Sequence, residues 1–156
     1  MNVLRRKFLK SAVYISAATS AIGAGLLAPG RLFAAYSAEA FSAKTVSEAL
    51  IAALGSDAHT PSGDIKLKAP DIAENGAVVP VTVSSTLPNV DSITIVATAN
   101  PTPLTSTYTL TNGAEPFVST RIKMGKTANV VAVVRSNGKL YSASKEVKVT
   151  IGGCGG

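Results

Sequence analysis

The chain has 156 residues, a formal net charge of +6, one cysteine, one histidine and no tryptophan. This length suits a single domain. Five of the 15 Lys and Arg residues lie within the first 35 positions, where no Asp or Glu occurs, so the rest of the chain is nearly neutral. A nearly neutral body without Trp offers neither a basic stripe nor a base-stacking surface, and we therefore expect no nucleic-acid partner.

The N-terminal segment has the pattern of an export signal. Arg5, Arg6 and Lys7 precede Phe8-Leu9-Lys10, and a weakly apolar stretch with small residues follows. This order is typical of a secretory signal, and the adjacent Arg5 and Arg6 resemble a twin-arginine signal. We predict a signal peptide over residues 1–40, with cleavage near 35–40, after either Ala35 or Ala40.

The apolar stretch of this signal is rich in Ala, Ser and Gly, which makes it less hydrophobic than a good membrane span. We therefore expect a periplasmic protein, exported folded by the twin-arginine route, without stable membrane association after signal removal. One Cys and one His form no ligand set for zinc, haem or an iron–sulfur cluster, so no cofactor is expected. Export together with a partner that lacks its own signal is one reason for a folded route.

The domain that follows, residues 41–151, begins with a helical pattern. Apolar residues recur on one face over residues 45–55, and Gly55 is a plausible C-terminal cap. The members of that face are Val46, Ala49, Leu50, Ala53 and Leu54. The pattern predicts a short amphipathic helix packed on the domain.

From Asp64 onward the pattern predicts strands. The predicted segments are Ile65–Leu67, Val78–Ser85, Ser92–Thr98, Thr105–Thr111, Val118–Met124, Ala128–Val134 and Tyr141–Ile151. Pro80 indicates an edge or a bulge, Ala128–Val134 reads as a central strand buried on both sides, and Asn137-Gly138 is a strong hairpin signal. About seven short strands favour an all-β, immunoglobulin-like antiparallel β-sandwich with a short N-terminal helix.

The polar residues of this domain do not form a recognisable catalytic set. His59 lies in a predicted loop, Ser56–Gly63, and the carboxylates Asp71, Glu74 and Asp91 are scattered. Neither a Gly-x-Ser-x-Gly elbow nor a phosphate-binding loop occurs. We therefore expect a protein that is not an enzyme and has no catalytic site of its own.

The last five residues read Gly152-Gly153-Cys154-Gly155-Gly156. Glycine removes steric hindrance and widens backbone freedom, so residues 152–156 are predicted to form a flexible arm that carries Cys154 into a narrow cleft of another protein. A free cysteine has a pKa of about 8.5, and the nearest basic residue is Lys148, so a partner enzyme would have to activate the thiol.

Two other roles for Cys154 remain open. An odd, exposed cysteine in an oxidising compartment can form an intermolecular disulfide, which would make the chain an exported structural sandwich domain that dimerises through Cys154. A thiol redox protein is the third possibility, although a dithiol site needs a second cysteine.

Three segments of the sequence resemble the SoxY family of sulfur carriers. The first is Lys145 to Gly156, which includes the terminal motif; the second is Pro70–Gly76 with Val79–Val83; the third is Ser119–Ile122 with Val130–Val133. The resemblance covers nearly all the chain after the signal, and the terminal motif is its most specific part.

The resemblance implies that Cys154 is the covalent attachment site for intermediates of thiosulfate oxidation. It implies a heterodimer with a SoxZ-like subunit, a second sandwich protein that lacks its own signal. It also implies a haem protein that attaches thiosulfate, a dinuclear-manganese hydrolase that releases sulfate and, in some organisms, a molybdenum enzyme that oxidises the remaining sulfur.

Overall fold

The computed structural model describes residues 38–111 and 113–150. Two helices come first, α2 (Ala38–Ser42) and α3 (Val46–Leu54). Thr45 caps α3 in a capping box with Glu48, and Gly55 ends the helix with a left-handed φ of 79°. The predicted helix is therefore confirmed. The sequence pattern did not predict α2, since five residues are too few to display a helical period.

Nine strands follow the helices in the described part of the chain. They are β1 (Thr60–Pro61), β2 (Ile65–Lys68), β3 (Ile72–Ala73), β4 (Val79–Ser85), β5 (Val90–Ala97), β6 (Leu104–Thr109), β7 (Phe117–Ile122), β8 (Ala128–Ser136) and β9 (Lys139–Val149). The seven predicted strands correspond to β2 and to β4 through β9. The two-residue strands β1 and β3 were missed, because two residues show no alternation.

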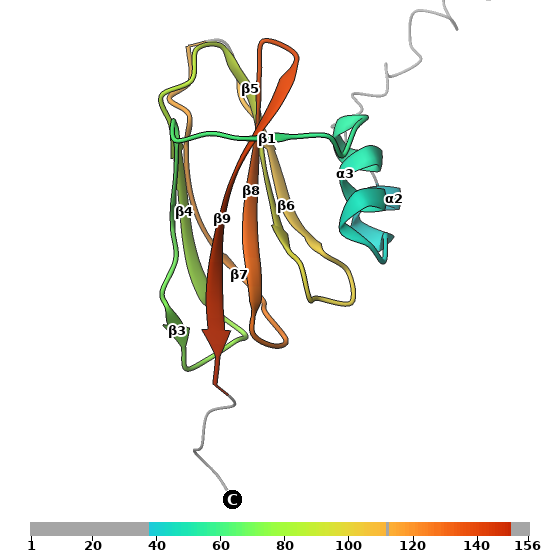
Figure 1. Cartoon of the computed structure of the whole chain (residues 1–156), viewed down its shortest axis with the longest axis vertical. Helices are drawn as coiled ribbons and strands as arrows, with labels where there is room; N and C mark the ends of the chain where they lie inside the picture. Colours follow the sequence, from blue (N-terminus) through green and yellow to red (C-terminus); the bar gives the residue numbers. More distant parts are fainter. Residues whose placement is uncertain (1–37, 112, 151–156) are drawn as a thin grey trace, which may run out of the picture. The chain divides into compact units, whose positions relative to one another are not determined.

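The strands form two sheets, one on each side of an apolar core (Figure 1). The larger sheet has the order β1-β9-β8-β5-β6, with β3 also paired to β9, and the smaller has the order β2-β4-β7. All the longer strands pair antiparallel, whereas β1 and β3 run parallel to β9. The all-β sandwich is thus confirmed in outline, and its immunoglobulin-like detail stays a prediction.

The helices add a third layer against the outer face of the larger sheet (Figure 1). Leu50 and Leu54 of α3 pack there with Val133 of β8 and Leu104 of β6, while Val130 on the opposite face of β8 faces the smaller sheet. This arrangement confirms that β8 is a central strand buried on both sides, and it explains why its sequence is apolar without alternation.

The predicted hairpin at Asn137-Gly138 is confirmed, and Pro80 lies inside a strand. Asn137 and Gly138 have φ of 50° and 74°, and they join β8 to β9 in a two-residue hairpin. Pro80 lies in β4, which is the middle strand of the smaller sheet, but β2 pairs only with residues 82–85 of β4. Pro80 has a partner strand on one side only, β7. The Ser85 N–H donates to the Pro116 carbonyl in that ladder, and backbone groups alternate, so the nitrogen of Pro80 faces the unpaired side and its missing N–H disrupts no ladder.

Among the described residues, no helix is long and apolar enough to cross a membrane. In the same residues, no three His, Cys, Asp or Glu side chains gather closely enough to hold a metal ion.

Candidate functional site

The candidate site lies at the end of β9, where the domain passes into its C-terminal segment (Figure 1). Cys154 and its neighbours Gly152, Gly153, Gly155 and Gly156 lie outside the described residues, as do Arg5 and Arg6. The described part of the site is residues 147–150, which we call the arm root. Cys154 lies four positions after Thr150 in the chain, which limits their Cα atoms to about 14 Å apart.

The inner side of the arm root is held by β8 and by the loop that precedes it. Val147 is fully buried and lies opposite Ala128 in the β8–β9 ladder. One step further, the backbone N–H of Val149 donates to the Thr127 hydroxyl at 2.9 Å. A side chain thus continues the ladder by one bond beyond the point where β8 begins.

The outer side of the arm root is held by the short parallel strand β3. The N–H of Lys148 donates to the Asp71 carbonyl at 3.0 Å, and the N–H of Thr150 donates to the Ala73 carbonyl at 3.1 Å. Without β3, this end of β9 would be an open sheet edge. Pairing on both sides fixes the position and direction of the chain up to Thr150.

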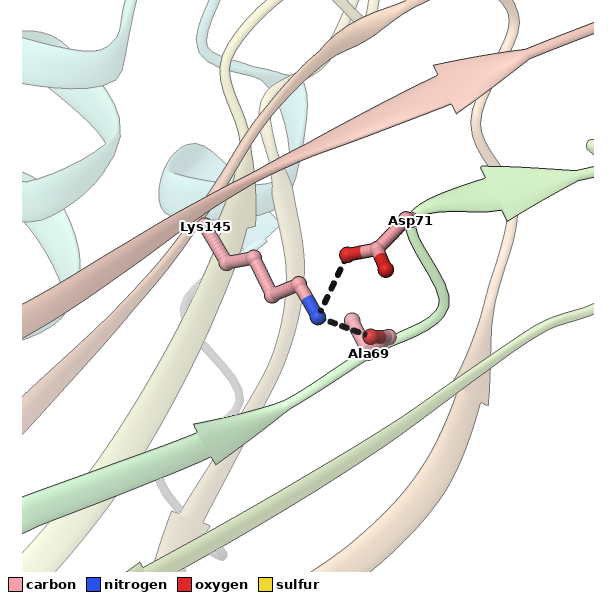
Figure 2. Close-up of polar contacts among 3 residues, drawn as sticks. All are labelled: Ala69, Asp71 and Lys145. Carbon is pink, nitrogen blue, oxygen red and sulfur yellow. Dashed lines mark hydrogen bonds and ion pairs between the residues drawn. The ribbon is translucent and has the colours of Figure 1, made fainter.

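Lys145 fastens the segment before β3 to the middle of β9 (Figure 2). Its Nζ donates to the Ala69 carbonyl at 2.6 Å and lies 3.0 Å from Asp71 Oδ1. The Lys145 side chain is 34% exposed, whereas that of Asp71 is 89% exposed. The carbonyl bond is therefore the stronger restraint, since an exposed ion pair contributes little.

Gly76 lets the loop after β3 approach the arm root closely. Its carbonyl accepts the Met124 N–H at 2.7 Å. A Cβ atom at position 76 would overlap the Met124 carbonyl oxygen and would lie 2.8 Å from Val149 Cγ1. Only glycine fits here without displacing the backbone of Met124 or the side chain of Val149.

Replacing Lys145 with methionine is expected to loosen the outer side of the arm root. The Ala69 carbonyl loses its donor, so β3 should detach locally and the amides of Lys148 and Thr150 should exchange their hydrogens faster. Asp71→Asn is the matched control: it keeps the bond to Ala69 and should change the same exchange rates little. Equal exchange in all three proteins, followed residue by residue, would contradict the assignment.

A groove of about 590 Å³ lies at the same end of the larger sheet. Leu104 and Thr105 of β6 line it, together with Arg121 and Lys123 at the end of β7. Asn100 shapes the groove by donating to the Lys123 carbonyl at 2.7 Å and accepting from the Gly125 N–H at 3.1 Å. No pattern in the sequence around Asn100 indicates this bridging role.

The other polar residues considered from the sequence do not converge. His59 is exposed and lies immediately before β1. Asp71 is engaged by Lys145, whereas Glu74, just after β3, and Asp91, in β5, are both exposed and lie on different elements. The predicted loop Ser56–Gly63 needs one correction, because Thr60 and Pro61 within it pair with Tyr141 and Ser142 of β9.

The fold and the arm root together define a small all-β sandwich protein whose last strand is anchored on both sides immediately before a Gly-rich, cysteine-containing segment. The family model for the sulfur oxidation protein SoxY matches residues 50–154, from α3 to Cys154. The match covers more than half of the chain. This chain belongs to the SoxY family.

One solved structure agrees with the family match, and another shares the fold. The sulfur carrier protein SoxY from Chlorobium limicola f thiosulfatophilum is 45% identical, with a TM-score of 0.62, over 70% of this chain and 96% of that chain. The superoxide reductase (neelaredoxin) from Ignicoccus hospitalis is 25% identical, with a TM-score of 0.50, over 59% of this chain and 81% of that chain. A comparison with curated protein sequences gives no match.

Proposed function

We propose that this chain is a covalent sulfur carrier that holds intermediates of thiosulfate oxidation on Cys154 and presents them to partner enzymes. The observation that carries the proposal is the arm root: the chain is fixed on both sides up to Thr150, and the only cysteine follows four residues later. A fixed root with a short glycine-rich extension suits a thiol that must enter another protein's active site.

The chemistry asked of the chain is limited to one thiol. Attaching thiosulfate to Cys154 forms an S–S bond and releases the thiol proton and two electrons, which the resemblance assigns to a haem protein. Hydrolysis with one water then releases sulfate and leaves a persulfide on Cys154, a step assigned to a dinuclear-manganese protein. In this proposal the chain is a substrate of these enzymes, and of a molybdenum enzyme where one is present, but not an enzyme itself.

The proposed partner in the resting state is a SoxZ-like subunit, and the proposed compartment is the periplasm, reached folded through the twin-arginine signal at Arg5 and Arg6. Export as a preformed complex would bring out a subunit that has no signal of its own. Replacing both arginines with lysine should then retain both proteins in the cytoplasm, as measured by fractionation.

Helix α2 favours one of the two cleavage sites. It spans Ala38–Ser42, and Ala40 is only 1% exposed among the residues that pack between the helices and the larger sheet. Cleavage after Ala40 would cut this helix, whereas cleavage after Ala35 would leave it whole. We therefore place the mature N-terminus at Tyr36.

Intact-mass measurement tests these proposals together. Mature protein from cells oxidising thiosulfate is weighed before and after treatment with reductant. We expect the mass of residues 36–156 with a ladder of sulfur and sulfonate adducts that reductant removes. If the only modified species is a disulfide dimer, even from actively oxidising cells, the exported structural domain that dimerises through Cys154 becomes the better account.

A further inference from the structure

The outer face of the smaller sheet carries exposed basic side chains. Side chains alternate along its three strands, so every second residue points away from the core. Lys66 and Lys68 of β2, Phe117 and Arg121 of β7, and Lys123 just after β7 all lie on this side and are exposed, and we call them the basic face. Among the described residues, no helix or strand covers this face, whereas α2 and α3 cover the outer face of the larger sheet.

The basic face has no carboxylate that balances its charge. Its three strands contain Lys66, Lys68 and Arg121 but no Asp or Glu. Within residues 38–111 and 113–150, the one ion pair joins Lys145 to Asp71, so the cations of the basic face have no acidic partner there. Because the chain after residue 35 is nearly neutral, the single sign of this face reflects the placement of charges and not an excess of basic residues.

The basic face adjoins the arm root at one end. Lys123 immediately precedes the residue whose N–H bonds the carbonyl of Gly76, the glycine that approaches the arm root. At the other edge of the face, Lys68 immediately precedes the residue whose carbonyl is bonded by Lys145 of β9. A protein bound to the basic face would therefore lie beside the segment that leads to Cys154.

Protection of the sheet edges does not fully account for the basic face. Charges on the edge strands β2 and β7 discourage pairing with other chains, but carboxylates also serve that purpose. Asp64 and Glu115 precede the same two strands, at the end away from the arm root, so acidic residues do occur along these edges. Edge protection also leaves unexplained why Phe117 is 50% exposed, whereas aromatic residues and Arg are enriched at protein interfaces.

We propose that the basic face docks an acidic surface on the enzyme that loads Cys154. The proposal rests on the carrier function proposed above. Opposite charges raise the rate of encounter between two proteins and orient them as they meet. Docking on this face brings the enzyme to the arm root, so the short glycine-rich segment has only a small distance to span. Attraction of this kind is screened by salt, which allows the enzyme to leave after one reaction.

The test measures loading of the mature chain, purified with its SoxZ-like subunit, by the haem protein and thiosulfate. The readout is the rate at which the mass of the thiosulfate adduct appears at low salt. Lys68→Glu with Arg121→Glu should lower kcat/KM at least tenfold, and added salt should slow the natural chain toward this variant. The matched control is Lys44→Glu with Lys139→Glu, which reverses two exposed cations outside the basic face and should stay within about twofold of the natural rate.

Two further measurements separate docking from damage to the fold or to the thiol. The midpoint of thermal unfolding should be the same in the natural chain and in both double variants, because all the substituted side chains are exposed. Cys154 should react with iodoacetamide at the natural rate in all three proteins, since this small neutral reagent needs no docking surface. Slower loading with both values unchanged then reports on the encounter with the enzyme.

Three results would overturn the proposal, and they differ in what else they overturn. A natural chain that the haem protein never loads would contradict the carrier function as well. If the natural chain is loaded, equal loading of the two double variants at low salt would remove the docking face alone. Loss of the SoxZ-like subunit from the Lys68→Glu, Arg121→Glu variant during purification would assign the basic face to that subunit instead.

Discussion

Replacing Cys154 with serine is expected to remove every reductant-sensitive sulfur adduct from the chain and to abolish its use by the partner enzymes. The substitution changes one atom, and the chain has no second cysteine to take over. Residue 154 lies four positions past Thr150, the last residue with a described hydrogen bond, so the midpoint of thermal unfolding should stay unchanged. Adducts that persist in a folded Cys154→Ser protein would contradict the carrier function directly.

A second pair of substitutions tests the glycine beside Cys154 rather than its sulfur atom. Gly153→Val leaves the thiol in place but adds a β-branched side chain beside it, which narrows the backbone conformations and widens the segment that must enter a cleft. We expect kcat/KM of the partner enzymes to fall at least tenfold, which corresponds to about 1.4 kcal/mol of transition-state stabilisation. With Gly153→Ala, kcat/KM should lie between the values for the natural chain and for Gly153→Val. Unchanged kcat/KM with Gly153→Val would remove the steric argument.

Replacing Gly76 with alanine is expected to lower the free energy of unfolding by about 3 kcal/mol, the upper range for a side chain forced into occupied space. The added methyl would overlap the Met124 carbonyl and press on Val149, so the loop after β3 must move away from the arm root. Chemical denaturation measures the loss. Faster hydrogen exchange at Thr150 would place the damage at the end of β9.

Gly63→Ala provides the matched control for this change. A Cβ atom at Gly63 meets nothing within 4 Å, and the loop there needs no left-handed backbone. Its free energy of unfolding should therefore stay within about 0.5 kcal/mol of the natural value or rise slightly, because alanine restricts the unfolded chain. Equal losses at positions 63 and 76 would show that the contact at Gly76 is unimportant.

The sequence was informative where local physics decides the structure. The period of α3, the alternation along β7 and the Asn137-Gly138 turn each depend on neighbours a few residues apart, and each was predicted correctly. The burial of β8 on both faces was also visible, because a strand covered by two layers needs no polar face. These features follow from hydrophobic patterning alone.

The parts that stayed hidden depend on contacts between distant residues. β3 exists because Asp71 and Ala73 meet the end of β9, more than 70 positions later in the chain, and no pattern in Ile72–Ala73 announces this pairing. The role of Gly76 likewise depends on Met124 and Val149. For Cys154, by contrast, residue type and spacing in the sequence suggested the role. The fold adds the anchored arm root that precedes it.

The pairing of β9 also has a consequence for how the protein is made. β1, β3 and β8 all bond to this last strand, so the larger sheet stays incomplete until the ribosome has released the residues around Val149. A chain broken off before Val147 would leave β8 with a bare edge and two upstream segments without partners, a state prone to aggregation and degradation. Completion of the larger sheet therefore requires a chain that has been synthesised to within a few residues of Cys154.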